Sequence, residues 1–198
     1  MANVDLNLIQ KLRDITGAGM MDCKKALIEA NGDIETAKEL LRKKGAAVAQ
    51  KRAANKCCEG LVHAYIHPGA RVGVLIEIDC ETDFVARTDD MKQLAQDLCL
   101  HIAALKPICV RPEDMDPAVM EKERAFHREE LLAQGKPTQM VDKILEDKML
   151  KFYEDMCLLN QKFVKDDKYT VAQVIENLVG KLGEKIEIRR FSRFEIGA

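Results

Sequence analysis

The sequence predicts an α+β fold in which a small helical module precedes a core of sheet and helices. Apolar residues recur with a helical period over residues 5–44, and the period changes to two over residues 61–80. The helical period returns after Asp89, and a last alternating run covers residues 185–196. These changes indicate three strands, which we expect to form a three-stranded antiparallel sheet covered by helices.

Residues 1–45 are predicted to form a module of three short helices. The segment TGAG breaks the pattern after the first helix, and Asn31 and Gly32 end the second. Asp33 is suited to cap the third helix, and Gly45 to end it in the left-handed conformation. Residues 46–60, rich in alanine and basic residues, are predicted to be a linker, helical or not, before a core of residues 61–198.

Residues 61–80 are predicted to form a β-hairpin. The alternating runs LVHAYIH and VGVLIEIDC flank PGAR, which has the composition of a tight turn. In the second strand one face is apolar, and Glu77 and Asp79 lie on the other face. The apolar face consists of Val72, Val74, Ile76 and Ile78. One side of the hairpin should therefore be packed and the other solvated.

A helix is predicted from Asp89 or Asp90, either of which can cap it, to Pro107. Its buried stripe should be Met91, Leu94, Leu98, Ile102 and Leu105. Residues 117–151 are predicted to form a helical hairpin arm, with Asp116 as cap and Pro117 in the first turn. The apolar seam of its first helix should be Val119, Phe126 and Ala133, and that of its second Val141, Ile144, Leu145 and Phe152.

The C-terminal part is predicted to be irregular over residues 160–168, then helical, then extended. Thr170 is placed to cap the helix, and Gly180 and Gly183 to end it. The final strand should bury one set of alternating residues, with Phe191 interrupting the alternation as at a bulge. The buried set is Ile186, Ile188, Phe194 and Ile196.

Composition excludes several classes of protein. Lys and Arg number 31 against 33 Asp and Glu, a formal charge of −2, which gives no sign of a nucleic-acid partner. No secretion signal or membrane-spanning run is present in the sequence, so we expect a cytoplasmic protein without a membrane contact. The seven cysteines contain no C-x-x-C pair and are expected to be reduced thiols, mostly buried.

No motif for catalysis, phosphate binding or a metal is found, so the chain is not expected to be an enzyme or to carry a metal or cofactor. His63 and His67 are four residues apart on a strand, about 13 Å, which is too far to share a metal. A weaker alternative makes paired acids of Asp79, Glu81 and Asp83, because acids two apart on a strand share a face.

Two short segments allow two interpretations each. In CETDFVA, Asp83 caps the turn and Phe84 packs under the next helix, or the pair is exposed for another purpose. Met20 and Met21 begin the core face of the second helix, or Gly17 and Gly19 hold them on a loop where flexible thioethers contact another protein. Composition does not decide between these interpretations.

Two longer motifs carry a resemblance to a known family. LRDITGAGMMDCKKALIEANGDIETA and IDCETDFVAR resemble the two signatures of the elongation factor Ts family. The likeness continues through HPGARVGVL, KPICVRPEDM, GKPTQMVDKILEDKMLKFYED, LLNQKFV and RFEIG, and so covers nearly the whole chain. The resemblance implies that residues 1–45 are a ubiquitin-associated-like domain and that residues 117–151 are the coiled-coil arm of the family.

The resemblance also implies a function. Members are guanine nucleotide exchange factors that bind elongation factor Tu carrying GDP and let GTP replace it. The matching positions imply that Asp83 and Phe84, with their neighbours Thr82 and Val85, dislodge the Mg²⁺ of the GTPase. Contacts to the same partner are implied for Arg13, Met20, Met21 and His67.

The sequence departs from the longer members, which carry two half-cores and a C-terminal module. Only one hairpin unit is found here, and we expect a homodimer in which a second copy supplies the other half through the arm or the sheet edge. The alternative function is a ubiquitin-associated-like adaptor whose GAGMM loop binds a partner without altering nucleotide exchange.

Overall fold

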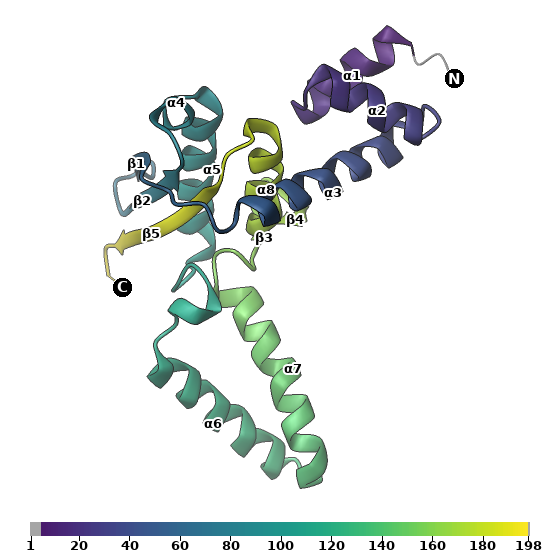
Figure 1. Ribbon diagram of the computed structural model, residues 1–198. Coiled ribbons are helices and arrows are strands. Elements are labelled where there is room, and N and C mark those ends of the chain that lie inside the picture. Colours follow the sequence, from purple (N-terminus) through teal and green to yellow (C-terminus); the bar gives the residue numbers. More distant parts are fainter. Residues whose placement is uncertain (1–4, 198) are drawn as a thin grey trace. The chain divides into compact units, whose positions relative to one another are not determined.

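The computed structural model describes residues 5–197, which form a mixed α+β structure as the sequence predicts (Figure 1). The chain divides into two compact units. The first contains the described residues up to 61 together with 78–93 and 173–187. The second contains residues 62–77, 94–172 and the described residues from 188 onward.

Three helices begin the first unit: α1 (Leu6–Thr16), α2 (Met20–Glu29) and α3 (Ile34–Arg52). Asp33 caps α3 as predicted, its carboxylate accepting from the Thr36 amide at 2.8 Å. Gly17, at φ 66°, ends α1 in the left-handed conformation that glycine adopts without steric cost. The helices enclose one apolar cluster, made of Ile9, Leu12, Cys23, Ala26, Leu27, Ala30 and Ala37.

The prediction that Gly45 ends the third helix is wrong, because α3 continues to Arg52. Gly45 instead lies against α8 (Val171–Leu182). A Cβ placed on Gly180 would be only 2.6 Å from the Cα of Gly45, so the two helices approach backbone to backbone. Gly180 therefore lies inside α8, and only Gly183, at φ 74°, ends that helix as predicted.

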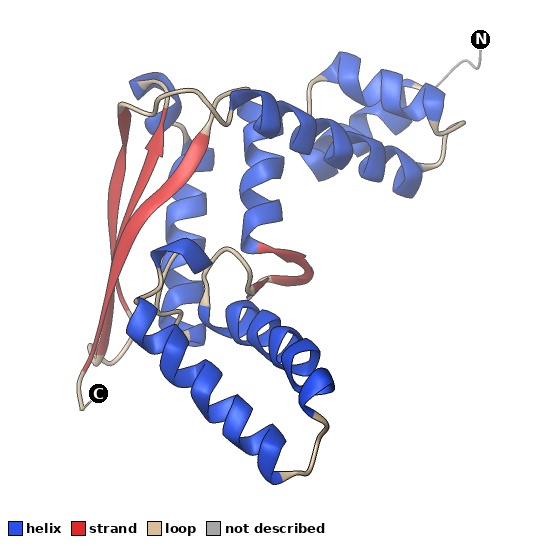
Figure 2. Ribbon diagram, turned by 60° about the horizontal axis from the view of Figure 1, so that its bottom comes forward, coloured by secondary structure: helices blue, strands red, loops and turns tan. Residues whose placement is uncertain are grey.

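Strands β1 (Glu59–Ile66), β2 (Val72–Cys80) and β5 (Ile186–Glu195) form the predicted three-stranded sheet, in the order β1-β2-β5 (Figure 2). Val74, Ile76 and Ile78 of the central strand are buried, which confirms the predicted apolar face. In the second unit, His63 of β1 is hydrogen-bonded to Gln96 of α5 (Asp89–Leu105) at 2.8 Å, so α5 packs on the hairpin.

The predicted alternation fails in the second half of β5. Ile186 and Ile188 are buried, but Phe194 and Ile196 are exposed, where the sequence predicted one buried set. Arg189 and Arg190 are both exposed, so the buried side of the strand changes between them. Arg190 is paired there with Glu77 of the central strand. The shift of side begins before Phe191, the residue that interrupts the sequence pattern.

Helix α5 buries the predicted stripe except for Leu105, which is exposed at the last turn. Its cap is Thr88 and neither of the aspartates, because the Thr88 hydroxyl accepts from the Met91 amide at 3.3 Å. The same helix contains His101, which is fully buried and hydrogen-bonded to Gln161 at 2.8 Å. Burial lowers the pKa of His101, so this network contains a neutral imidazole.

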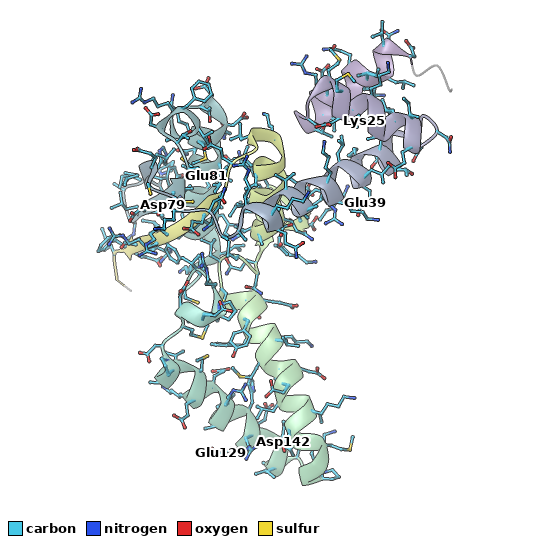
Figure 3. The ribbon with its side chains drawn as sticks, in the orientation of Figure 1. Lys25, Glu39, Asp79, Glu81, Glu129 and Asp142 are labelled. Carbon is cyan, nitrogen blue, oxygen red and sulfur yellow. The ribbon has the colours of Figure 1, made fainter. Side chains whose placement is uncertain are left out.

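The arm consists of α6 (Pro117–Ala133) and α7 (Thr138–Met156), and Asp116 caps α6 as predicted. The predicted seam of α6 is wrong, because Val119 and Phe126 are exposed. The buried cluster between the helices is Leu131, Val141, Leu145 and Met149. Polar residues occupy other facing positions of α6, where Arg124 pairs with Glu146 at 2.9 Å. Glu129 and Asp142 lie near the joined ends of the two helices (Figure 3).

The segment predicted to be irregular contains two short strands, β3 (Lys162–Phe163) and β4 (Asp166–Thr170), paired antiparallel. Thr170 is thus the last residue of β4, directly before α8. A 3-10 turn, η1 (Pro112–Asp114), precedes the arm, and a four-residue helix, α4 (Asp83–Ala86), follows β2. The structure describes seven free cysteines, and five of them are buried, which confirms the prediction that most are buried.

We predict that Gly180→Ala lowers the free energy of unfolding by about 2 kcal/mol, because the added methyl group would overlap the backbone of Gly45. An alanine in place of a helical glycine ordinarily stabilises by up to about 1 kcal/mol, so the sign itself is diagnostic. Urea unfolding measures the change, with Lys51→Ala on the exposed side of α3 as a control expected to differ little. Stabilisation by Gly180→Ala would contradict the close approach.

Candidate functional site

The turn after β2 presents Asp83 and Phe84 to solvent. Thr82 caps α4, its hydroxyl accepting from the Val85 amide at 3.4 Å. This cap orients the short helix so that Val85 is 4% exposed and Phe84 is 78% exposed. The interpretation in which Phe84 packs under the next helix is therefore wrong. The ring is an isolated apolar group on the surface of the first unit.

Asp83 does not cap the turn, since Thr82 has that role. Its carboxylate lies 2.9 Å from the Arg87 guanidinium, one helical turn later, and both side chains are well exposed. An exposed pair of this kind contributes little to stability. Asp83 and Phe84 thus form a charged and an apolar group side by side that the fold itself does not require.

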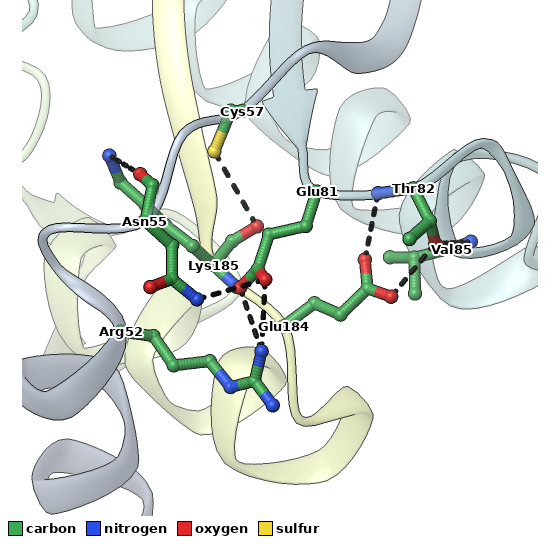
Figure 4. Close-up of polar contacts among 8 residues, drawn as sticks. All are labelled: Arg52, Asn55, Cys57, Glu81, Thr82, Val85, Glu184 and Lys185. Atoms are coloured by element: carbon green, nitrogen blue, oxygen red, sulfur yellow. Dashed lines mark hydrogen bonds and ion pairs between the residues drawn. The ribbon is translucent and has the colours of Figure 1, made fainter.

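Glu81, the residue before this turn, accepts hydrogen bonds from three residues of the first unit (Figure 4). The Arg52 guanidinium at the end of α3 lies 2.9 Å from its carboxylate, and the Asn55 amide is also at 2.9 Å. The backbone amide of Lys185 donates at 2.6 Å. The Lys185 amide, followed by Arg52 and Asn55, holds the pKa of Glu81 below its usual range.

Glu184, in the loop between α8 and β5, holds the next residue of the turn. Its carboxylate accepts from the Thr82 amide at 3.1 Å and from the Thr82 hydroxyl at 2.8 Å (Figure 4). Lys185 extends from the same loop and donates from Nζ to the Asn55 carbonyl at 3.1 Å. The turn is therefore fixed to the end of α3 and to the loop after α8.

The geometry of Glu81 and Asp83 does not support the alternative that groups them with Asp79 as paired acids. Glu81 is bonded to Arg52, Asn55 and Lys185, whereas Asp83 pairs with Arg87. The two carboxylates have separate partners and do not share a proton-transfer site. Among residues 5–197, no group of three or more His, Cys, Asp or Glu residues is placed to hold a metal ion.

The predicted contact residues of the helical module lie on its surface. Arg13 is exposed on α1, and Met20 and Met21, the first two residues of α2, are 44% and 63% exposed. The core face of α2 begins only at Cys23, so the interpretation of the methionines as core residues is wrong. The exposed thioethers follow directly after Gly19, which precedes the helix in extended conformation.

The turn between α1 and α2 lies close to the end of α8. A Cβ on Gly17 would come within 2.8 Å of the Lys181 side chain, whose ammonium pairs with Asp90 at 2.7 Å. Asp90 is in the first turn of α5, shortly after α4. The C-terminal end of α8 therefore contacts the methionine-bearing module through Lys181, and the loop after it contacts Thr82 through Glu184.

His67 is exposed directly after β1, and its Nδ1 is 2.9 Å from the Tyr65 hydroxyl. It belongs to the second unit, whereas Arg13, Met20, Met21 and the turn belong to the first. His63 of the same strand is hydrogen-bonded to Gln96, as described above, and has a structural role.

Sequence reasoning missed the residues that support the turn. The sequence predicts Arg52 to lie in a linker and gives no sign that Glu184 and Lys185 belong to the site. They are 29 residues before and about a hundred after their partners, so no local spacing indicates them. The sequence offers one indication of these contacts. Glu81 directly follows the predicted second strand, and Glu184 directly precedes the predicted last strand.

Comparison with known proteins is consistent across the chain. The family model described as Elongation factor TS matches residues 7–198. Elongation factor Ts of Koribacter versatilis is 51% identical over 195 residues, which are 98% of this chain and 89% of that protein. Elongation factor Ts of Fervidobacterium nodosum is 49% identical over 194 residues, which are 98% of each of the two chains. The chain belongs to the elongation factor Ts family. It is thus a translation elongation factor of that family.

Elongation factor Ts of Desulforamulus reducens adds a match of 50% identity over 197 residues, 100% of this chain and 91% of that protein. The two motifs identified in the sequence lie in the first unit, on α1 to α3 and on the segment from β2 through α4. No helix within residues 5–197 combines the length and the apolar character needed to span a membrane.

We predict that Phe84→Ala leaves the free energy of unfolding within about 0.5 kcal/mol of the wild type, because the ring is largely in water already. The neighbouring Val85→Ala should cost about 2 kcal/mol, since it empties a buried position. Chemical unfolding of both variants tests the pair. A large loss with Phe84→Ala would mean that the ring packs within its own chain.

Proposed function

We propose that this protein is the guanine nucleotide exchange factor of elongation factor Tu, and that it acts by displacing the Mg²⁺ bound with GDP. Family membership supports the coarse role. The observation that carries the mechanism is the exposed Asp83 and Phe84 pair on a turn held by hydrogen bonds at both Glu81 and Thr82. Such a pair can enter another protein without unfolding its own.

Exchange by this route needs no covalent chemistry. A GTPase binds GDP through backbone amides, a lysine and a Mg²⁺ ion that joins protein and phosphate, so losing the ion removes a large stabilising charge. A ring inserted between packed helices shifts them as a unit, because close-packed interiors do not deform gradually. The proposed agents of this displacement are Thr82, Asp83, Phe84 and Val85. All metal and nucleotide ligands belong to the partner.

Other surfaces are proposed to supply affinity. The exposed Met20 and Met21, with Arg13 on the preceding helix, form a mixed apolar and cationic surface on the helical module. His67 is proposed as a contact from the second unit. Since the GTPase acts in translation, we place the protein in the cytoplasm. It contacts neither nucleic acid nor membrane in this proposal.

We predict that the wild type accelerates GDP release from elongation factor Tu and that Phe84→Ala lowers the maximal rate more than tenfold. Burying one aromatic ring contributes about 1.5–3 kcal/mol, which matches a loss of that size. Release of a fluorescent GDP analogue in stopped flow measures the rate. Phe126→Ala, which removes another exposed ring, from α6, is the matched control and should retain the wild-type rate.

The same assay tests the alternative. A ubiquitin-associated-like adaptor would bind the GTPase or another protein without changing the release rate. Unchanged release with wild-type protein would therefore reject the exchange function, whereas wild-type rates with Phe84→Ala would reject only the role of the ring.

We further propose that two copies of the chain form a homodimer through the sheet. Its exposed side carries several large apolar residues, namely Val62, Ile66, Leu75, Phe194 and Ile196. Four of these line one shallow hollow together with Arg71. Contiguous apolar surface of this kind is uncommon on monomers and typical of contacts between proteins. A second copy also matches the expectation of one half-core per chain.

We predict that the wild type sediments as a dimer at micromolar concentration and that Phe194→Asp gives a monomer. A buried, unpaired carboxylate at a two-fold contact is strongly unfavourable because it occurs in both copies. Phe126→Asp on the arm is the control and should stay dimeric. A wild-type monomer would reject the assembly. A dimer that persists in Phe194→Asp would place the contact elsewhere.

A further inference from the structure

Two dipeptides of the first unit, Glu81–Thr82 and Glu184–Lys185, are joined by a pair of reciprocal hydrogen bonds. The carboxylate of Glu81 accepts the backbone amide of Lys185 at 2.6 Å, and the carboxylate of Glu184 accepts the backbone amide of Thr82 at 3.1 Å (Figure 4). We call these four residues the reciprocal clamp. Each glutamate thus binds the amide that follows the other glutamate, and hydrogen bonds to an ionised carboxylate are about twice as strong as neutral ones.

The clamp is connected directly to the cap of α4. The Thr82 hydroxyl donates to Glu184 at 2.8 Å and accepts from the Val85 amide at 3.4 Å. A hydroxyl has one hydrogen to donate, so the bond to Glu184 fixes the direction of the lone pair that faces Val85. The position of the Glu184 carboxylate therefore determines the orientation of the helix that carries Phe84.

Phe84 depends on this support because α4 has little packing of its own. The helix has four residues, and only Val85 and Ala86 are buried. A ring on a loosely held turn would occupy many directions, and ordering it on binding would cost free energy. A turn fixed in advance delivers the ring to the same place each time.

We propose that Glu81 and Glu184 are positioning residues for exchange, which act on the partner through Phe84 and contribute little to affinity. The proposal rests on the exchange function proposed above. Glu81 is held by more hydrogen bonds, because Arg52 and Asn55 also bind its carboxylate. Glu184 has the more direct connection, because it binds both the amide and the hydroxyl of Thr82.

The decisive variant is Glu184→Gln, which keeps the size of the side chain but leaves one acceptor oxygen for the two donors of Thr82. Stopped-flow release of the fluorescent GDP analogue should show a maximal rate about tenfold lower, with the half-saturating concentration of the factor changed less than twofold. Glu187→Gln is the matched control. Glu187 pairs with the Lys185 ammonium at 3.0 Å and lies outside the clamp, so its variant should match the wild type.

A double-mutant cycle separates positioning from general damage to the fold. In the Phe84→Ala background the ring is absent, so Glu184→Gln should lower the rate less than twofold further. An equal tenfold loss in both backgrounds would overturn the proposal. So would a wild-type maximal rate in Glu184→Gln, or a loss that appears only in the half-saturating concentration.

Hydrogen exchange of the free protein gives a readout that does not depend on the partner. The amides of Thr82 and Val85 should exchange about tenfold faster in Glu184→Gln and unchanged in Glu187→Gln. Unchanged exchange in Glu184→Gln would overturn the clamp itself. If these amides respond as expected but the wild-type protein fails to accelerate GDP release, the proposed exchange function is wrong and the role of the clamp in exchange is rejected with it.

Discussion

The contact between Gly45 and Gly180 is the constraint on which the first unit depends. With no Cβ on Gly180, the backbones of α3 and α8 meet at a distance that a larger side chain at this position would prevent. Helix α3 can then continue to Arg52, which reaches Glu81, and α8 leads through Gly183 to Glu184, which reaches Thr82. The contact between α3 and α8 thus positions both Arg52 and Glu184, which hold the turn. The turn then sets the direction of Phe84.

The side chains of the turn fall into two kinds: those that bind other groups of their own chain and those that are left exposed to solvent. Carboxylates at Glu81 and Glu184 bind backbone amides and side-chain donors of their own chain, so they are committed to structure. Asp83 and Phe84 are left in water, and the fold gains little from either. Exposed groups that stability does not explain are the ones available to a partner. The proposed action on the nucleotide site of another protein would use such a surface.

Local rules predicted much of this fold. Asp33, Asp116 and Gly183 act as the sequence suggests, because caps and stops depend on neighbours in the chain. Gly45 was misassigned since its role depends on a helix far along the sequence, and the seam of α6 was misassigned because polar residues pack there while Phe126 is exposed. At the site, the sequence pattern does not decide between a packed and an exposed Phe84, and the role proposed for this residue comes from the family resemblance. Neither the sequence pattern nor the family resemblance predicts the reciprocal clamp, because hydrogen bonds between distant glutamates and amides leave no periodic signal in the sequence.

The proposed exchange mechanism requires more free energy than burial of the Phe84 ring supplies. A thousandfold acceleration corresponds to about 4 kcal/mol, whereas burying one aromatic side chain yields about 1.5–3 kcal/mol. In the free protein Phe84 is already exposed on a fixed turn, so nearly all of that burial is gained on contact with the partner. In the proposed mechanism, the remainder comes from the loss of metal ligation in the partner or from contacts such as those proposed for Met20 and Met21. Because coupling is reciprocal, whatever lowers nucleotide affinity lowers factor affinity equally, and incoming nucleotide then drives the factor off. A rigid, weakly self-packed ring suits that cycle, since it can enter and leave without rearranging its own chain.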